Sequence, residues 1–143
     1  MARAADDARR LKLVYAACVE LIAAYVPHVI AVESYAPLVG KQGGSAWKTS
    51  VVYGLVHGIG LSANRPVVAQ APQQIKRAFV QGRQNSKQDV QAALCRLVPN
   101  LSDKLLAVCA SKREHLADAA AHAVLALDNL QLAQASAAHA RLG

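Results

Sequence analysis

Two short runs of β-branched and other apolar residues interrupt a chain whose pattern is otherwise helical. Residues 28–34 read His-Val-Ile-Ala-Val-Glu-Ser, and residues 67–70 read Val-Val-Ala-Gln. Runs of this length and composition are typical of short strands that are buried on both faces. Because helical patterns stand before, between and after them, the chain is predicted to be an α/β protein with short central strands flanked by helices.

Six segments have the apolar spacing or the end signals of helices. In residues 8–26, apolar side chains recur at steps of three and four: Leu11, Val14, Cys18, Leu21 and Tyr25. Asp6 and Asp7 stand where a helix cap and a partner for the helix dipole belong, and Pro27 stops the helix. The other predicted helices are residues 45–61, with Ser45 as cap, and residues 72–80, 87–97, 101–110 and 112–138.

The last predicted helix is the longest, and its apolar side chains predict which face it buries. The stripe expected to face the core comprises Leu116, Ala120, Ala123, Leu127 and Leu130. The tail, residues 131–143, is rich in Ala and is expected to fray. Because aromatic residues make up only 4% of the chain, the core must be built from Ala, Val and Leu, which favours closely packed helices.

Size and cysteine content indicate the class of protein. A length of 143 residues with 54% hydrophobic residues predicts one folded domain, residues 1–143. Cys18, Cys95 and Cys109 form no C-x-x-C pair, so we expect free core thiols in a reducing compartment and no structural zinc site. No secretion signal and no charge-free apolar run of about 18 residues occur, so we expect a cytosolic protein that does not cross a membrane.

The charge balance indicates a partner. The formal net charge is +7, and a small domain with this excess typically meets nucleic acid, an anionic membrane or an acidic protein. The alternative is a soluble protein that is merely basic.

Glu33, His115 and Asp118 are the candidate site residues. Glu33 ends the first apolar run, which is where α/β folds place their sites, although a strand-end Glu can also simply face solvent. His115 and Asp118 are three residues apart and share one helix face, but the charged run before them, Lys112 to Glu114, also fits a solvated face. We interpret His122, further along the same face, as a partly buried histidine rather than a ligand.

Lys76 and Lys87 could hold phosphates, although each could equally be an ordinary surface lysine. The chain has no Gly-x-Gly-x-x-Gly, P-loop, G-x-S-x-G or H-E-x-x-H motif. Nucleotide-binding and serine- or zinc-hydrolase functions therefore have no support in the sequence.

Four segments in the same order resemble RuvC-type Holliday junction resolvases. They are Arg10-Leu-Lys-Leu-Val-Tyr-Ala-Ala, His28-Val-Ile-Ala-Val-Glu33, Gln74-Ile-Lys76 with Lys87-Gln-Asp-Val90, and His115-Leu-Ala-Asp118-Ala. The resemblance runs from about Asp6 to Leu127. It implies an RNase H-like fold of the retroviral integrase superfamily and a homodimer that cuts four-way DNA junctions in recombination and repair.

The resemblance also implies the roles of the site residues. Glu33, His115 and Asp118 match catalytic residues that hold Mg²⁺, for which Mn²⁺ can substitute. Lys76 and Lys87 match lysines near the scissile phosphate. Tyr35 stands beside Ala36, which occupies the position of a family aromatic that stacks on junction bases, and Lys41 and Arg83 are further expected DNA contacts.

One part of the family pattern has no counterpart. The family begins with a strand that reads roughly Gly-Ile-Asp-Pro-Gly, followed by two more strands, and the 143 residues contain none of the three. We therefore expect an N-terminally truncated version of the fold, with one edge of residues 29–32 left without a neighbouring strand. Because the missing Asp is a metal ligand, we expect weak metal binding and slow cleavage by these residues alone.

Two other interpretations remain open. The chain could be a degenerate RuvC-like module that binds branched DNA or a partner without cutting. It could also be a basic helical interaction domain whose similarity is accidental. In the resolvase interpretation, residues 45–61 are expected to join two copies because they carry a surplus of apolar side chains: Trp47, Val51, Tyr53, Leu55 and Ile59.

The charge generates a testable prediction. Junction binding should weaken steeply with salt, because neutralising about six phosphates releases counterions and gives a log–log slope of about −5. The cations expected near the site are Lys41, Lys48, Lys76, Arg77, Arg83 and Lys87. Titration of a labelled four-way junction at several salt concentrations measures the slope, and a flat response would contradict the prediction.

Overall fold

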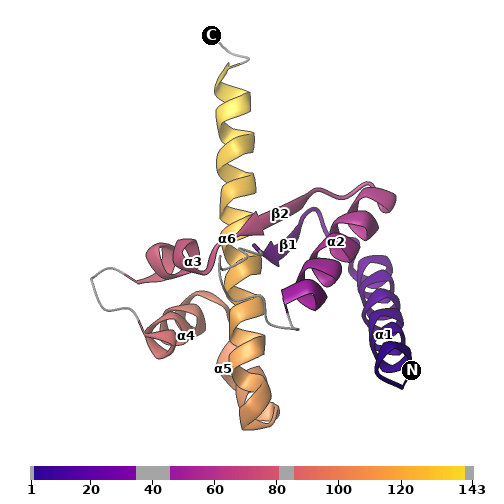
Figure 1. The fold of residues 1–143 in the computed structure, drawn as a ribbon. Coiled ribbons are helices and arrows are strands. Elements are labelled where there is room, and N and C mark those ends of the chain that lie inside the picture. Colours follow the sequence, from indigo (N-terminus) through magenta and orange to yellow (C-terminus); the bar gives the residue numbers. More distant parts are fainter. Residues whose placement is uncertain (1, 35–45, 81–85, 141–143) are drawn as a thin grey trace. The chain divides into compact units, whose positions relative to one another are not determined.

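The structure is a computed structural model, which describes residues 2–34, 46–80 and 86–140 (Figure 1). The elements run in the order α1 (Ala2–Tyr25), β1 (Ile30–Glu33), α2 (Ala46–Ser62), β2 (Val67–Gln70), α3 (Pro72–Phe79), α4 (Lys87–Leu97), α5 (Leu101–Ala107) and α6 (Ala110–Ala140). They form two compact units, unit 1 up to Ala69 and unit 2 from Gln70 onward, which are described in turn. The order confirms the predicted alternation of helices and strands.

Unit 1 contains a strand–helix–strand arrangement. β1 and β2 are hydrogen-bonded neighbours that run in the same direction, and the Ile30 N–H donates to the Pro66 carbonyl oxygen at 2.9 Å. α2 connects them and contacts both α1 and β1. Among the described residues, β2 is the one strand paired with β1, as expected for a sheet without the family's first strands.

A close approach of backbone and side chains fixes the connection from α2 to β2. The Arg65 N–H donates to the Gly60 carbonyl oxygen at 2.8 Å, and Asn64 between them adopts a left-handed φ of 52°. A Cβ added to Gly60 would lie 2.2 Å from a methyl carbon of Val67. Glycine is therefore required where the end of α2 meets the first residue of β2.

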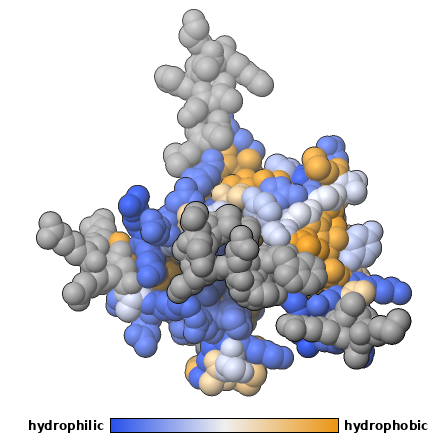
Figure 2. Space-filling view, viewed as in Figure 1, coloured by the Kyte–Doolittle hydropathy of each residue, from blue (hydrophilic) through white to orange (hydrophobic). Residues whose placement is uncertain are grey.

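The free flank of β1 is apolar. A pocket of about 280 Å³ lies between α1, α2 and the start of β1, and its lining includes Leu21, Tyr25, Val29 and Ile30. Tyr25 is 77% exposed, so the pocket opens to the surface. Figure 2 shows hydrophobic residues at the surface over α2.

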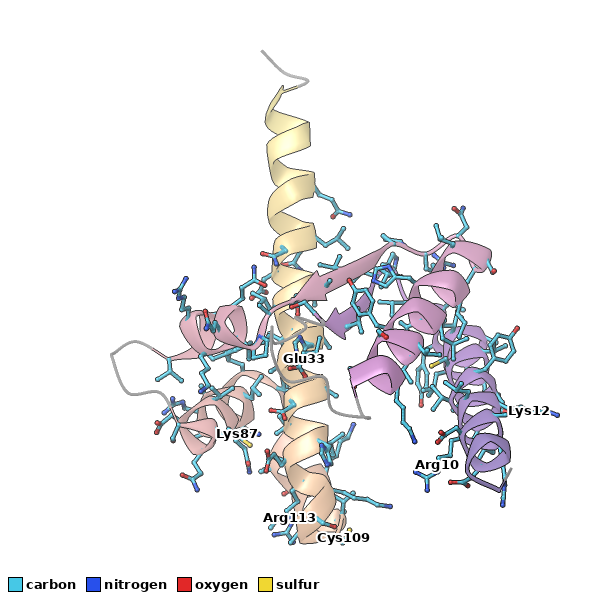
Figure 3. All side chains as sticks on the ribbon, viewed as in Figure 1. Arg10, Lys12, Glu33, Lys87, Cys109 and Arg113 are labelled. Atoms are coloured by element: carbon cyan, nitrogen blue, oxygen red, sulfur yellow. The ribbon has the colours of Figure 1, made fainter. Side chains whose placement is uncertain are left out.

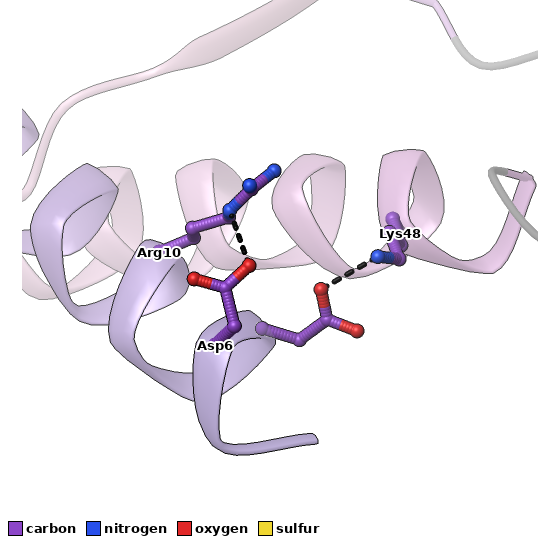
Figure 4. A network of polar contacts seen from close by, with 4 residues as sticks. Asp6, Arg10 and Lys48 are labelled. Carbon is purple, nitrogen blue, oxygen red and sulfur yellow. Dashed lines mark hydrogen bonds and ion pairs between the residues drawn. The ribbon is translucent and has the colours of Figure 1, made fainter. Parts of the chain in front are cut away.

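Asp6 and Asp7 do not cap α1, which corrects the sequence prediction. The helix begins at Ala2, so both aspartates lie inside it, and both contact cations instead (Figure 4). Asp6 pairs with Arg10 at 2.9 Å, and Asp7 accepts a hydrogen bond from Lys48 of α2 at 2.5 Å. The helix begins six residues before the predicted start at residue 8, whereas its predicted end was close, because Pro27 stops the helix just after Tyr25.

Unit 2 is a group of helices around Leu94, whose side chain is 0% exposed. The other core residues come from each of its helices: Ile75, Val90, Leu101, Leu105, Ala117 and Ala121. α4 begins with a capping box in which the Ser86 Oγ accepts from the Asp89 N–H and the Asp89 carboxylate accepts from the Ser86 N–H. The predicted bounds of this helix, residues 87–97, are confirmed.

The predicted buried stripe of α6 is wrong. Leu116 and Leu127 are 36% and 50% exposed, and the buried residues are Ala117, Ala121 and Ala126. The prediction followed side-chain size, whereas α6 contacts α3, α4 and α5 and buries its smallest side chains. Small side chains allow neighbouring helices to approach closely, so they occupy the contact, and Leu116 and Leu127 remain outside it.

Two other expectations concern the surface. The three cysteines are free. Cys18 and Cys95 are half-buried but Cys109 is exposed, so Cys109 is not the core thiol that was predicted.

None of the helices in the described part of the chain is both long and apolar enough to cross a membrane. The proposed cap Ser45 lies outside the described residues.

The core of unit 2 supports a stability prediction. Leu94→Ala should lower the free energy of unfolding by about 2–5 kcal/mol, because it removes buried methyl groups and leaves a cavity. Leu97→Ala is the matched control, since Leu97 ends the same helix but is 62% exposed. Urea unfolding followed by helical circular dichroism compares them, and equal losses would contradict the proposed core.

Candidate functional site

Glu33 is the last residue of β1, and its side chain is exposed. The hydrogen bonds between β1 and β2 hold the backbone that carries it. Within the described residues, the Glu33 carboxylate takes part in no hydrogen bond or ion pair. Glu33 is labelled in Figure 3.

His115 and Asp118 lie on α6 in unit 2. His115 is exposed and Asp118 is half-buried, and a spacing of three residues places them on one helix face. The Asp118 carboxylate also makes no hydrogen bond or ion pair with a described residue. His115 therefore lies at the surface of unit 2, whereas Asp118 is partly sheltered.

The convergence of Glu33 with this pair stays a prediction, because Glu33 belongs to unit 1 and the pair to unit 2. Within either unit, the described residues include no group of three His, Cys, Asp or Glu side chains that could hold a metal ion.

Lys87 contacts the segment next to the helix pair. It is the first residue of α4 and forms an ion pair with Glu114, which directly precedes His115 in α6. The hydrogen bond from Lys87, followed by its positive charge, lowers the pKa of Glu114. A phosphate that approached Lys87 would compete with the Glu114 carboxylate for its ammonium group. The sequence did not predict this ion pair.

Of the remaining expected DNA contacts, Lys76 lies in the part of the chain that the structure describes. Lys76 is exposed on α3, a helix that starts at Pro72 and is stabilised where the Gln74 side chain accepts from the Ala71 N–H at 2.6 Å. Tyr35, Lys41 and Arg83 lie outside the described residues. Their expected roles stay predictions.

A buried polar pair lies close to the helix pair in unit 2. Gln70 ends β2 and is 2% exposed, and His122 of α6 is 8% exposed. Their side chains meet at 3.0 Å. The prediction that His122 is at least partly buried is confirmed, but its partner was missed. In the sequence, the one sign of a role for Gln70 was that it is a polar residue at the end of an apolar strand.

Comparison with known proteins identifies the family. Residues 2–126 match the model of the family described as crossover junction endodeoxyribonuclease RuvC. This range covers most of the chain and both units, so the chain belongs to the RuvC family. No curated protein matches the chain.

Two solved structures of RuvC from Thermus thermophilus are similar to this chain. The first, in complex with a Holliday junction substrate, has 22% sequence identity and a TM-score of 0.60, and the match covers 84% of this chain and 70% of that chain. The second has 23% identity and a TM-score of 0.63, with 86% and 71% covered. Together with the family match, they confirm the predicted RNase H-like α/β fold.

The Lys87–Glu114 contact generates a prediction about pH. Lys87→Met should raise the pKa of Glu114 toward its ordinary value, because it removes the hydrogen bond and the charge that lower it. In the parent chain, the pair stabilises the fold above the ordinary carboxyl pKa, and this contribution is lost as the pH falls through the lowered pKa. NMR titration of the Glu114 side chain measures the change.

Lys112→Met is the control for this titration. Lys112 stands two residues before Glu114 on α6 and is not a cause of its lowered pKa. The same shift in both variants would mean that the general positive charge of the chain, rather than Lys87, sets the pKa of Glu114.

Proposed function

We propose that the chain is a metal-dependent, structure-specific endonuclease of the Holliday junction resolvase type, acting on four-way DNA junctions. The observation that carries this proposal is the family match over residues 2–126, which includes Glu33, His115 and Asp118. The solved relative in complex with a Holliday junction and the net charge of +7 support junction DNA as the substrate.

The donor set fits a hard divalent cation. Carboxylate oxygens are the ligands that Mg²⁺ prefers, and Mg²⁺ is commonly held by one or two carboxylates together with phosphate oxygens of the substrate. Glu33 and Asp118 are the two carboxylates proposed as ligands, and neither forms an ion pair with another of the described residues. The His115 imidazole is a ligand that Mn²⁺ accepts more readily than Mg²⁺ does. When bound, such an ion supplies an activated water and stabilises charge on the scissile phosphate.

The chain's own residues divide the remaining tasks. Glu33 and Asp118 would provide the negative charge that attracts the cation, and His115 would add a nitrogen ligand. Lys76 and Lys87 contact phosphates of the DNA backbone, with Lys87 exchanging its Glu114 contact for a phosphate. Its side chain and that of Glu114 are 63% and 56% exposed, and solvent screens an exposed ion pair strongly.

A second candidate function is a junction-binding module that does not cut. The 143 residues contain no match for the family's first-strand Asp, and among the described residues the sheet has two strands. Phosphate contacts do not require a metal centre, so DNA binding would persist in such a module. Cleavage and binding must therefore be measured separately.

Charge removal at the proposed ligands tests the first function. Glu33→Gln and Asp118→Asn should each lower the cleavage rate of a synthetic four-way junction in Mg²⁺ or Mn²⁺ by about 10²–10³, because each removes a charge next to the reacting phosphate. Gel-shift affinity for the junction should stay within about twofold, as expected when the phosphate contacts remain intact. Asp128→Asn on α6 and Glu20→Gln on α1 are matched controls, since both side chains are exposed.

The outcomes separate the two functions. Binding without cleavage by the parent chain would favour the module. Cleavage that survives both substitutions would show that the metal ligands are other residues.

We also propose that the chain acts as a homodimer, because a four-way junction has two-fold symmetry and two cuts call for two related sites. Of the apolar residues on α2, Ile59 is 6% exposed inside unit 1, whereas Val51 is 39% exposed and open to a partner. Light scattering at micromolar concentration should show a dimer, and Val51→Asp should shift it to monomer. Leu127→Asp, an exposed residue on α6, is the control; a monomeric parent chain would overturn the proposal.

A further inference from the structure

Gln70 and His122 are the two polar side chains that are buried among the described residues. A buried polar group is costly unless it is hydrogen-bonded, so each needs the other or the backbone nearby. Their separation of 52 residues in the sequence means that the fold, not local structure, brings them together.

The Gln70 amide binds both the His122 ring and the backbone of α6. With its nitrogen toward His122, it donates to Nδ1 at 3.0 Å and to the His122 carbonyl oxygen at 3.1 Å, and its oxygen accepts from the Ala126 N–H at 3.0 Å. The opposite orientation would set its oxygen against an acceptor and its nitrogen against a donor. The favoured arrangement needs Nδ1 of His122 as an acceptor, which places the ring proton on Nε2.

His122 shares a helix face with the candidate metal ligands. It follows Asp118 by one turn and His115 by two, so it lies about 40° and about 20° from them around the helix axis. The rest of the buried surface of α6 is mainly alanine: Ala117, Ala121 and Ala126. Val124 and Leu125 also pack against the core, but all of these contacts are apolar and lack the directionality of hydrogen bonds. The hydrogen bonds of Gln70 to His122 and Ala126 are directional, so they favour one rotation of α6 about its axis.

We propose that Gln70 and His122 are positioning residues for the metal site, because their hydrogen bonds fix the rotation of α6 and thereby the direction in which His115 and Asp118 point. This inference rests on the proposed function. It adds that the metal ligands of this chain depend on a glutamine at the end of β2 and on the Nε2–H tautomer of a histidine that does not itself contact the metal.

The test measures Mn²⁺ binding to the full chain by electron paramagnetic resonance of the free ion. His122→Leu removes the acceptor for the Gln70 amide and should weaken Mn²⁺ binding by about tenfold, the lower end of the effect of losing a group that orients metal ligands. His122→Asn keeps an acceptor oxygen near the position of Nδ1 and should restore most of the affinity. Junction cleavage rates should follow the same order, with unchanged junction affinity.

A purely structural role predicts a different pattern. Both variants would then unfold at lower temperature but bind Mn²⁺ as the parent chain does, and that result would overturn the inference while leaving the proposed function intact. A parent chain that binds no Mn²⁺ would overturn both.

A measurement on the parent chain keeps the inference testable if His122→Leu does not fold. ¹⁵N NMR at a pH of about 8, where free imidazole is neutral, reports which ring nitrogen of His122 carries the proton. A protonated Nε2 is expected. A protonated Nδ1 would exclude the amide orientation on which the positioning role depends.

Discussion

The close contact of α6 with α3, α4 and α5 is the constraint on which unit 2 depends. Alanine at positions 117 and 121 lets these helices approach the fully buried Leu94, which a leucine at either position would prevent. The same choice of small side chains leaves the packing of α6 without strong directional preference. A buried His122 on that face then needs a polar partner, and Gln70 provides it at the end of β2. Helix packing and the hydrogen bonding of the buried His122 thus both constrain α6, the helix that carries His115 and Asp118.

The electrostatics of the chain are more local than its net charge suggests. Although the formal charge is +7, three of its cations contact carboxylates in the described residues, namely Arg10, Lys48 and Lys87. In contrast, the carboxylates of Glu33 and Asp118 have no cationic partner there. Among the described residues, the carboxylates of Asp6, Asp7 and Glu114 therefore offset nearby cations, whereas those of Glu33 and Asp118 do not.

The strand that carries Glu33 also has an unusual environment. β1 pairs with β2 on one side, and among the described residues no strand covers its other edge. An apolar pocket whose lining includes Val29 and Ile30 adjoins the start of β1. Glu33 ends this strand, so the pairing of β1 in the sheet also determines how a proposed metal ligand is held.

The sequence by itself determined the features that depend on neighbours a few residues away. Pro27 and Pro72 mark helix ends because they restrict their own backbone, and the Ser86–Asp89 capping box starts α4 within one turn. The order of the elements and the family resemblance, with the candidate residues that it implies, were equally readable. Only the tertiary structure decided which face of α6 is buried, because that choice follows from how closely other helices approach rather than from side-chain size. It also decided that Asp7 contacts Lys48 across 41 residues instead of capping α1, and that Gln70 reaches His122 across 52, since no local pattern encodes a contact between segments that meet only when the chain folds.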